Sequence, residues 1–141
     1  MYANILLSTD GSDVAKKGVK QGMTLAKALN AKVTVITVTE SPMLYLPTEE
    51  DLVGWEVARK EFAGKVLDAA RAMAEQAGIS AELLHVPDEH PATAIIETAK
   101  SRGCDLIVMA SHGRRGLGKL FLGSQTSEVL ADGSVPVLVV H

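Results

Sequence analysis

The sequence lacks several features of secreted, membrane and nucleic-acid-binding proteins. Cys104 is the single cysteine, which excludes a disulfide within the chain and fits a reducing compartment. No apolar run approaches the roughly 18 residues that cross a membrane, and the start, MYANILLSTDGS, lacks the basic region and long apolar run of a signal peptide. The net charge of −3 speaks against a general nucleic-acid binder. We therefore expect a cytoplasmic protein with neither nucleic acid nor a membrane as a partner.

The composition is that of an ordinary globular protein. The chain has 141 residues, of which 47% are hydrophobic and 22% charged, and this is enough for one domain with a real core. The sequence contains no internal repeat and no linker. We expect a single domain over residues 1–141.

Short aliphatic runs alternate with helical patterns along the chain. Because most of the runs are almost continuously apolar, they predict strands that are buried on both faces of a sheet. The predicted strands cover residues 3–9, 32–38, 80–86, 105–110 and 135–140. The predicted helices cover residues 13–29, 50–77, 91–102 and a last stretch from Gly123-Ser124 to Asp132-Gly133.

This alternation predicts a doubly wound α/β fold. Right-handed crossovers between parallel strands place helices on both faces of the sheet. We expect five parallel strands in the order 3-2-1-4-5, with the ligand crevice at the carboxyl ends of strands 1 and 4, where the strand order reverses. The first helix carries an apolar stripe through Val14, Val19, Met23, Ala26 and Leu29. Gly18 and Gly22, one turn apart, would permit this helix to pack closely on the sheet.

The loop after the fourth strand almost matches two phosphate-binding motifs. Gly113, four residues and Gly118-Lys119 form a P-loop in which Leu120 replaces the hydroxyl residue that would bind Mg²⁺. Gly116 and Gly118 begin a dinucleotide fingerprint, but Phe121 stands where its last glycine should be. The substitution by Leu120 excludes a Walker-type nucleoside triphosphatase.

Another phosphate site is compatible with the same loop. Gly113 can bring backbone N–H groups close to an anion, and the helix start at Gly123-Ser124 offers free N–H groups and a favourable dipole. Gln125 and Thr126 add side-chain donors, and Arg114 and Arg115 add positive charge. The alternative is a loop whose glycines only let the chain turn, with Ser124 as a simple N-cap.

The stretches LLSTDGS, DLIVMASHGRRGLGKLFLGSQTSEVL and VPVLVV resemble the universal stress protein family, and the resemblance covers essentially the whole chain. ATP-binding members of that family carry Gly, two residues, Gly, nine residues and then Gly-Ser or Gly-Thr. Gly113 and Gly123-Ser124 match this pattern. Ala110 stands at the first glycine and adds one methyl group at a point of close approach.

The resemblance implies an adenine-nucleotide ligand: ATP, or AMP or ADP, with or without Mg²⁺. In ATP-binding members, an aspartate after the first strand and a valine at the end of the second hold the adenine and ribose end, and Asp10 and Val38 occupy these positions. The predicted nucleotide site comprises Asp10, Val38, Met109, Ala110, His112, Gly113, Arg114, Arg115, Gly123, Ser124, Gln125 and Thr126.

Several of these residues have a simpler alternative role. Asp10 is either a contact for the nucleotide or Mg²⁺, or a turn residue at the start of a helix. His112 is either a phosphate contact or a polar loop residue. The stretch HVPDEHP, residues 85–91, gathers potential metal ligands, but its spacing matches no familiar metal site, and we predict none. Cys104 is expected to be a small core residue.

Three functions remain open from the sequence. The first is a nucleotide-binding regulatory module, involved in the stress response by family resemblance, whose occupancy alters its shape or its partners. The second is a slow ATPase or phosphotransferase, although no nucleophile and base are paired and we predict no catalytic residue. The third is a dimeric scaffold that binds no nucleotide. We also expect a homodimer through the C-terminal strand 135–140, because an apolar edge strand invites pairing, and family relatives often pair there.

Overall fold

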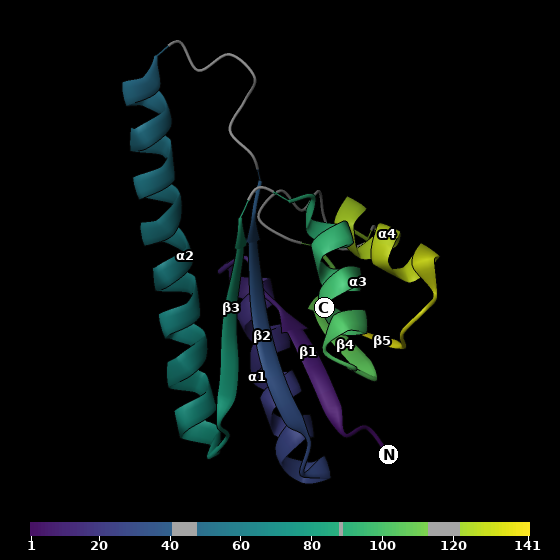
Figure 1. The fold of residues 1–141 in the computed structure, drawn as a ribbon. Helices are drawn as coiled ribbons and strands as arrows, with labels where there is room; N and C mark the ends of the chain where they lie inside the picture. The colour runs from purple at the N-terminus through teal and green to yellow at the C-terminus, as the bar shows by residue number, and fades with distance from the viewer. Residues whose placement is uncertain (41–47, 88, 113–121) are drawn as a thin grey trace.

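The protein is a five-stranded α/β sandwich in a computed structural model that describes residues 1–40, 48–87, 89–112 and 122–141 (Figure 1). Strands and helices alternate along the chain, as expected. The elements are β1 (Asn4–Ser8), α1 (Asp13–Leu29), β2 (Lys32–Thr39), α2 (Glu49–Ala77), β3 (Ala81–Pro87), α3 (Pro91–Ser101), β4 (Leu106–Ala110), α4 (Ser124–Asp132) and β5 (Val137–Val140).

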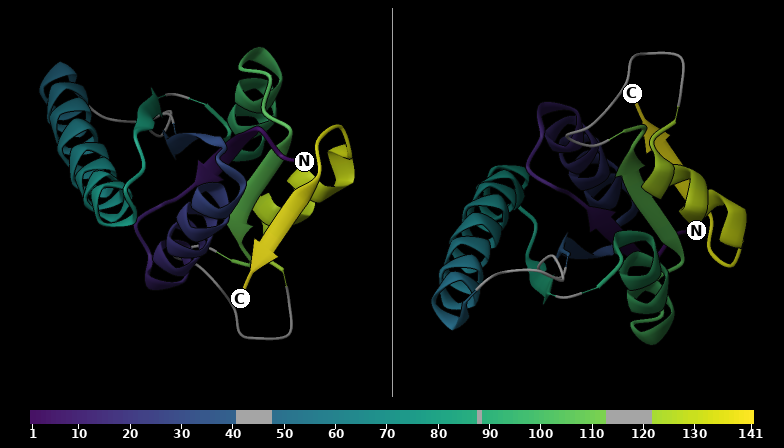
Figure 2. Two further views of the ribbon diagram at one scale, coloured as in Figure 1. Left: turned by 90° about the horizontal axis from the view of Figure 1, so that it is seen from below. Right: turned by 90° about the horizontal axis from the view of Figure 1, so that it is seen from above.

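The sheet confirms the predicted topology. All four strand pairs are parallel, and the strand order is β3-β2-β1-β4-β5. Helices α1 and α2 lie on one face, and α3 and α4 lie on the other (Figure 2). The order therefore reverses between β1 and β4, whose carboxyl ends meet at the same edge of the sheet.

Most predicted boundaries agree with the structure to within one residue, but β5 is shorter than expected. It begins at Val137 rather than at residue 135. Proline has no N–H to donate to a neighbouring strand. Pro136 nevertheless accepts a hydrogen bond through its carbonyl from the N–H of Ile107, at 2.9 Å. The chain thus joins the sheet at Pro136, one residue before regular pairing starts.

Helix α1 packs on the sheet through its smallest residues. Its buried residues are Ala15, Gly18, Val19, Gly22, Met23 and Ala26. The predicted stripe was therefore wrong at its two ends, since Val14 and Leu29 are only partly buried. A Cβ atom at Gly22 would overlap Cδ2 of Leu7, which is fully buried in β1. The absence of a side chain at Gly22 is what permits this close approach.

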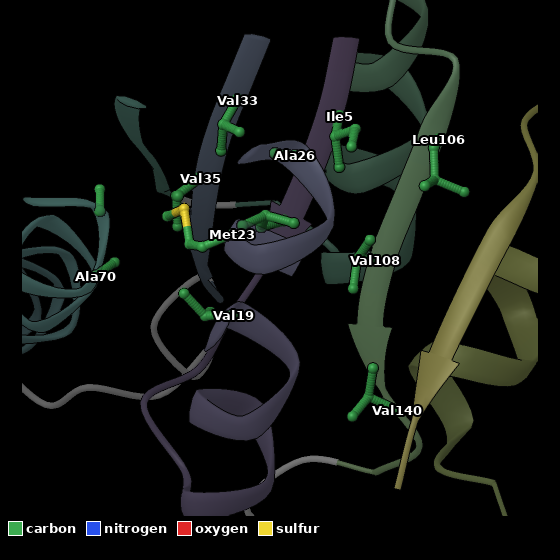
Figure 3. Close-up of a cluster of buried hydrophobic side chains, with 12 residues drawn as sticks. Ile5, Val19, Met23, Ala26, Val33, Val35, Ala70, Leu106, Val108 and Val140 are labelled. Atoms are coloured by element: carbon green, nitrogen blue, oxygen red, sulfur yellow. The ribbon is translucent and has the colours of Figure 1, made fainter. Parts of the chain in front are cut away.

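The core has two layers, one on each face of the sheet. The layer under α1 and α2 includes Ile5, Val35, Met23 and Val108, and most of its residues are aliphatic (Figure 3). The layer under α3 and α4 contains Cys104, which is 6% exposed. This burial confirms the predicted role of Cys104 as a small core residue, and it raises the pKa of the thiol.

Candidate functional site

The candidate site lies at the carboxyl ends of β1 and β4, and it is organised by the residues that follow β4. Ser111 is 3% exposed, and its N–H donates to the carbonyl of Val140 in β5 at 2.8 Å. Its own carbonyl accepts a hydrogen bond from the N–H of Gly123 at 2.7 Å. One residue therefore fixes both the end of β5 and the start of α4. Sequence reasoning missed Ser111, because nothing in the local pattern marks it as a bridge.

The start of α4 is an open helix terminus. Gly123, not Ser124, is the N-cap, and among the residues that the structure describes no side chain is seen to cap the helix there. The first turn leaves the N–H groups of Ser124, Gln125 and Thr126 without intrahelical acceptors, since the first backbone bond runs from the N–H of Ser127 to the carbonyl of Gly123 at 3.0 Å. These N–H groups and the helix dipole favour an anion. The interpretation of Ser124 as the N-cap was wrong.

Gly123 is required by a close approach and not by its backbone angles. Its φ of −63° is accessible to any residue. A Cβ atom at this position would lie 3.1 Å from Cα of His112 and 3.5 Å from the carbonyl oxygen of Ser111. The backbone after β4 and the start of α4 are thus stacked on each other at this glycine.

Two of the predicted phosphate donors have partners within the protein. The Thr126 hydroxyl is buried and donates to the carbonyl of Ala110 at 2.8 Å. The Gln125 side-chain oxygen accepts a hydrogen bond from the N–H of Ala92, in the first turn of α3, at 2.9 Å. These side chains therefore position the start of α4 against β4 and α3, while the N–H groups of both residues stay at the open helix terminus.

The predicted residues between 109 and 115 have three different outcomes. Met109 and Ala110 are 5% and 8% exposed and end β4, where Met109 packs into the core layer under α3 and α4. His112 is partly exposed, and its Nδ1 lies 3.2 Å from the hydroxyl oxygen of Ser111. Gly113, Arg114 and Arg115 lie outside the described residues.

Asp10 and Val38 stand at the carboxyl ends of the two neighbouring strands. The Asp10 carboxylate accepts a hydrogen bond from the N–H of Ser12 at 2.9 Å, in a turn that contains Gly11 at a φ of 81°. Ser12 then caps α1 by accepting from the N–H of Ala15 at 3.2 Å. Val38 is partly buried beside its partner Val86 in β3. The turn role considered for Asp10 is thus present, whereas the cap of α1 is Ser12.

The histidines of the 85–91 stretch point to different partners. Nε2 of His85 lies 2.7 Å from the Thr39 hydroxyl oxygen, and Nε2 of His90 lies 2.7 Å from a Glu128 carboxylate oxygen. Within the described residues, no three His, Cys, Asp or Glu side chains are grouped so as to hold a metal ion. In the same part of the chain, no helix is long and apolar enough to cross a membrane.

A depression of about 470 Å³ lies at the opposite edge of the sheet, near the amino ends of the strands. It is lined by Asn4, Lys32, Glu82 and Arg102, among others. Arg102 already forms an ion pair with Glu82. We assign the candidate site to the carboxyl edge, because an open helix terminus and the strand-order reversal coincide at that edge.

Variants of Gln125 distinguish its hydrogen bond to α3, which stabilises the protein, from its effect on a ligand at the start of α4. Gln125→Leu should lower the free energy of unfolding by about 1–3 kcal/mol, because the N–H of Ala92 in α3 then loses its hydrogen-bond acceptor. Gln125→Glu keeps an acceptor for Ala92 and should retain stability, but its negative charge should weaken binding of a phosphate at α4. Urea unfolding and calorimetric titration with ATP measure the two effects. Equal loss of stability in both variants would contradict the capping role.

Comparison with known proteins gives a consistent result. The model of the "Universal stress protein family" matches residues 1–141. Universal stress protein MJ0531 of Methanocaldococcus jannaschii is 36% identical over 146 aligned positions, which span 99% of this chain and 82% of the relative.

Two solved structures share the fold over almost their whole length. The protein MJ0577 is 28% identical, with a TM-score of 0.81 over 99% of this chain and 96% of that one. A universal stress protein in complex with cAMP is 26% identical, with a TM-score of 0.76 over 99% of this chain and 97% of that one.

Proposed function

This chain belongs to the universal stress protein family, and on that basis we propose that it binds an adenine nucleotide at the carboxyl ends of β1, β2 and β4. The phosphates would lie at the N-terminus of α4, and the adenine and ribose would lie towards Asp10 and Val38. Binding would serve a regulatory role in the stress response, with occupancy altering the shape or the partners of the protein.

The uncapped start of α4 is the observation that carries this proposal. Three backbone N–H groups there lack intrahelical acceptors, and the side chains of Gln125 and Thr126 hold the helix start in place rather than covering it. A preorganised set of N–H donors suits a phosphate group without any rearrangement. Gly113, Arg114 and Arg115 would complete the phosphate site.

The ligand class is supported by a relative. One universal stress protein of the same fold was solved with cAMP, an adenine nucleotide with a single phosphate. Asp10 is the candidate carboxylate for Mg²⁺ in the present chain, and its turn beside β1 lies next to the end of β4. If a magnesium ion accompanies the phosphates, it would neutralise part of their charge.

Mass spectrometry of the purified and then denatured protein tests the proposal most directly. We expect an adenine nucleotide to be released, and we expect calorimetric titration of the nucleotide-free protein to show ATP binding. Parallel titrations with AMP and with GTP distinguish the roles of the outer phosphates and the base. A protein that releases no nucleotide and takes up none of these ligands at millimolar concentration would contradict the proposal.

We infer that ATP is held rather than rapidly consumed. Phosphoryl transfer needs an oriented nucleophile in addition to charge around the γ-phosphate, and interactions that bind ground and transition states equally do not raise the rate. Leu120 replaces the hydroxyl residue that holds Mg²⁺ in a P-loop. We expect a turnover below about 1 s⁻¹, the low end of ordinary enzymes. Faster phosphate release that is abolished by Asp10→Ala would make the protein an enzyme.

We also propose that two copies pair through β5. This strand forms one edge of the sheet, and Val137, Leu138 and Val139 are only partly buried. Pairing along this edge would cover apolar surface and satisfy unpaired backbone groups under two-fold symmetry. Light scattering at micromolar concentration should give the mass of a dimer. A Val139→Lys variant should shift the mass towards the monomer, and a wild-type protein with monomeric mass would count against β5 pairing.

A further inference from the structure

The amino half of α2 exposes large apolar side chains. Leu52 and Trp55 are 38% and 39% exposed, and Val53 and Val57 are 59% and 52% exposed. The buried residues of this helix begin only at Ala63. In Figure 1 the same half of α2 extends past the carboxyl ends of the strands, beyond the part of the sheet that its second half covers. The apolar side chains are therefore not explained by packing on the sheet.

One side of this segment continues the face that packs on the sheet. Val66 and Ala70 are buried in the second half of α2, and Ala70 belongs to the core layer under α1 and α2. Leu52 and Trp55 precede Val66 by close to four and three whole turns, so they lie on the same side of the helix. Val57 precedes Val66 by about two and a half turns and lies on the opposite side. The apolar face thus runs on into a segment where Leu52 and Trp55 remain exposed.

We infer that this face, defined by Leu52 and Trp55, binds the same face of a second copy as an antiparallel helix pair. The charges along α2 favour this orientation. The helix begins with Glu49, Glu50 and Asp51 and carries the exposed Lys60 and Lys65 further on. Asp51 precedes Lys65 by close to four whole turns, so both lie on the same flank of the apolar face. An antiparallel pair whose two-fold axis crosses this face at the level of residue 58 places Asp51 of one copy opposite Lys65 of the other. A parallel pair would instead place the two acidic turns together.

The acidic first turn of α2 also favours a second copy of the protein over a membrane as the partner of this face. Amphipathic segments that bind anionic lipid surfaces rely on clusters of Lys and Arg, whereas the start of α2 is negative. The segment from residue 49 to residue 62 is about 21 Å long at 1.5 Å per residue, which makes a small interface. We therefore expect reversible association, as small interfaces are generally transient. The pair is separate from the β5 edge, so it would join β5 dimers into larger assemblies.

The single tryptophan makes the contact measurable in the full-length protein. Between about 1 µM and about 1 mM, a range suited to a weak pair, the emission of Trp55 should shift to shorter wavelength while the mass in sedimentation rises. Leu52→Glu should abolish the shift. Val57→Glu makes the same change at a more exposed apolar residue on the other side of α2 and should leave the shift intact. A shift that is independent of concentration, or one that Val57→Glu abolishes equally, would overturn the inference.

Charge reversal tests the antiparallel orientation itself. Asp51→Lys should weaken association, and Lys65→Glu should weaken it as well, because each places like charges opposite each other. Mixing the two variants should restore the Trp55 shift, since every facing pair is then of opposite sign. Failure of the mixture to recover, while the wild type associates, would overturn the antiparallel arrangement. A shift seen only with anionic phospholipid vesicles would assign the face to a membrane instead.

Discussion

Replacing Gly123 with valine should lower the affinity for ATP at least tenfold, which corresponds to about 1.4 kcal/mol. A Cβ atom at Gly123 would already lie 3.1 Å from the His112 Cα, and the branched side chain of valine adds two methyl groups at that contact. The start of α4 must then move away from Ser111, and its N–H groups lose their position for a phosphate. Since φ at Gly123 is −63°, backbone strain plays no part.

Ser124→Ala is the matched control for this variant. It removes a hydroxyl at the exposed first position of α4 but keeps the backbone N–H, so ATP affinity should change little if the backbone carries the binding. Calorimetric titration measures both affinities, and thermal unfolding checks that each variant is folded. Unchanged ATP affinity in Gly123→Val would contradict the placement of the phosphates at the start of α4.

The contact between Leu7 and Gly22 should give the largest effect on stability. Leu7→Ala removes a fully buried side chain and should lower the free energy of unfolding by about 2–5 kcal/mol. Gly22→Ala should cost about 1–3 kcal/mol, because its new methyl group overlaps Leu7 Cδ2 in a filled core. In the double variant the methyl group enters the space that Leu7 vacates. We therefore expect the double variant to be more stable than Leu7→Ala alone.

A double-mutant cycle measured by urea unfolding checks this expectation. The coupling free energy should be favourable and of the order of 1–3 kcal/mol, the range for residues in direct contact. Gly54→Ala supplies the control, since within the described part of the chain a Cβ at Gly54 meets no atom within 4 Å. Gly54→Ala should stabilise α2 by up to about 1 kcal/mol and combine additively with Leu7→Ala. If the effects of Gly22→Ala and Leu7→Ala on the free energy of unfolding were additive, the close approach of Gly22 to Leu7 would be contradicted.

The periodicity of the sequence was sufficient to predict the fold, because the local pattern of each segment favours the helix or strand that the segment forms. The aliphatic runs become strands buried on both faces, and α1 spans Asp13–Leu29 as its pattern predicts, with Ser12 as its cap and Asn30 at its end. Periodicity was less informative about which residues of α1 face the sheet. Hydrophobic size singled out Val14 and Leu29, which are only partly buried, whereas the close packing predicted for Gly18 and Gly22 is confirmed by their burial.

The candidate site was less predictable, because its residues are fixed by contacts between distant parts of the chain. Spacing located the helix start near Gly123, and the structure places an open helix terminus there. Spacing could not show that the Gln125 side chain caps α3, since that bond joins residues 33 positions apart. It also could not show that the Thr126 hydroxyl is engaged by Ala110. Short polar side chains at the start of a helix look the same in the sequence whether they contact a ligand or another part of the protein.

The hydrogen bonds of Ser111 would link the proposed nucleotide binding to the proposed pairing through β5. The chain of bonds from Gly123 to Ser111 and on to Val140 joins the proposed phosphate site to the β5 edge through a single residue. If a phosphate at α4 shifts or tightens this connection, it changes the free energy of pairing through β5. By reciprocity, pairing then changes the nucleotide affinity by the same factor. An adenine nucleotide would in this way report its concentration through the dimerisation constant of the protein, without being hydrolysed.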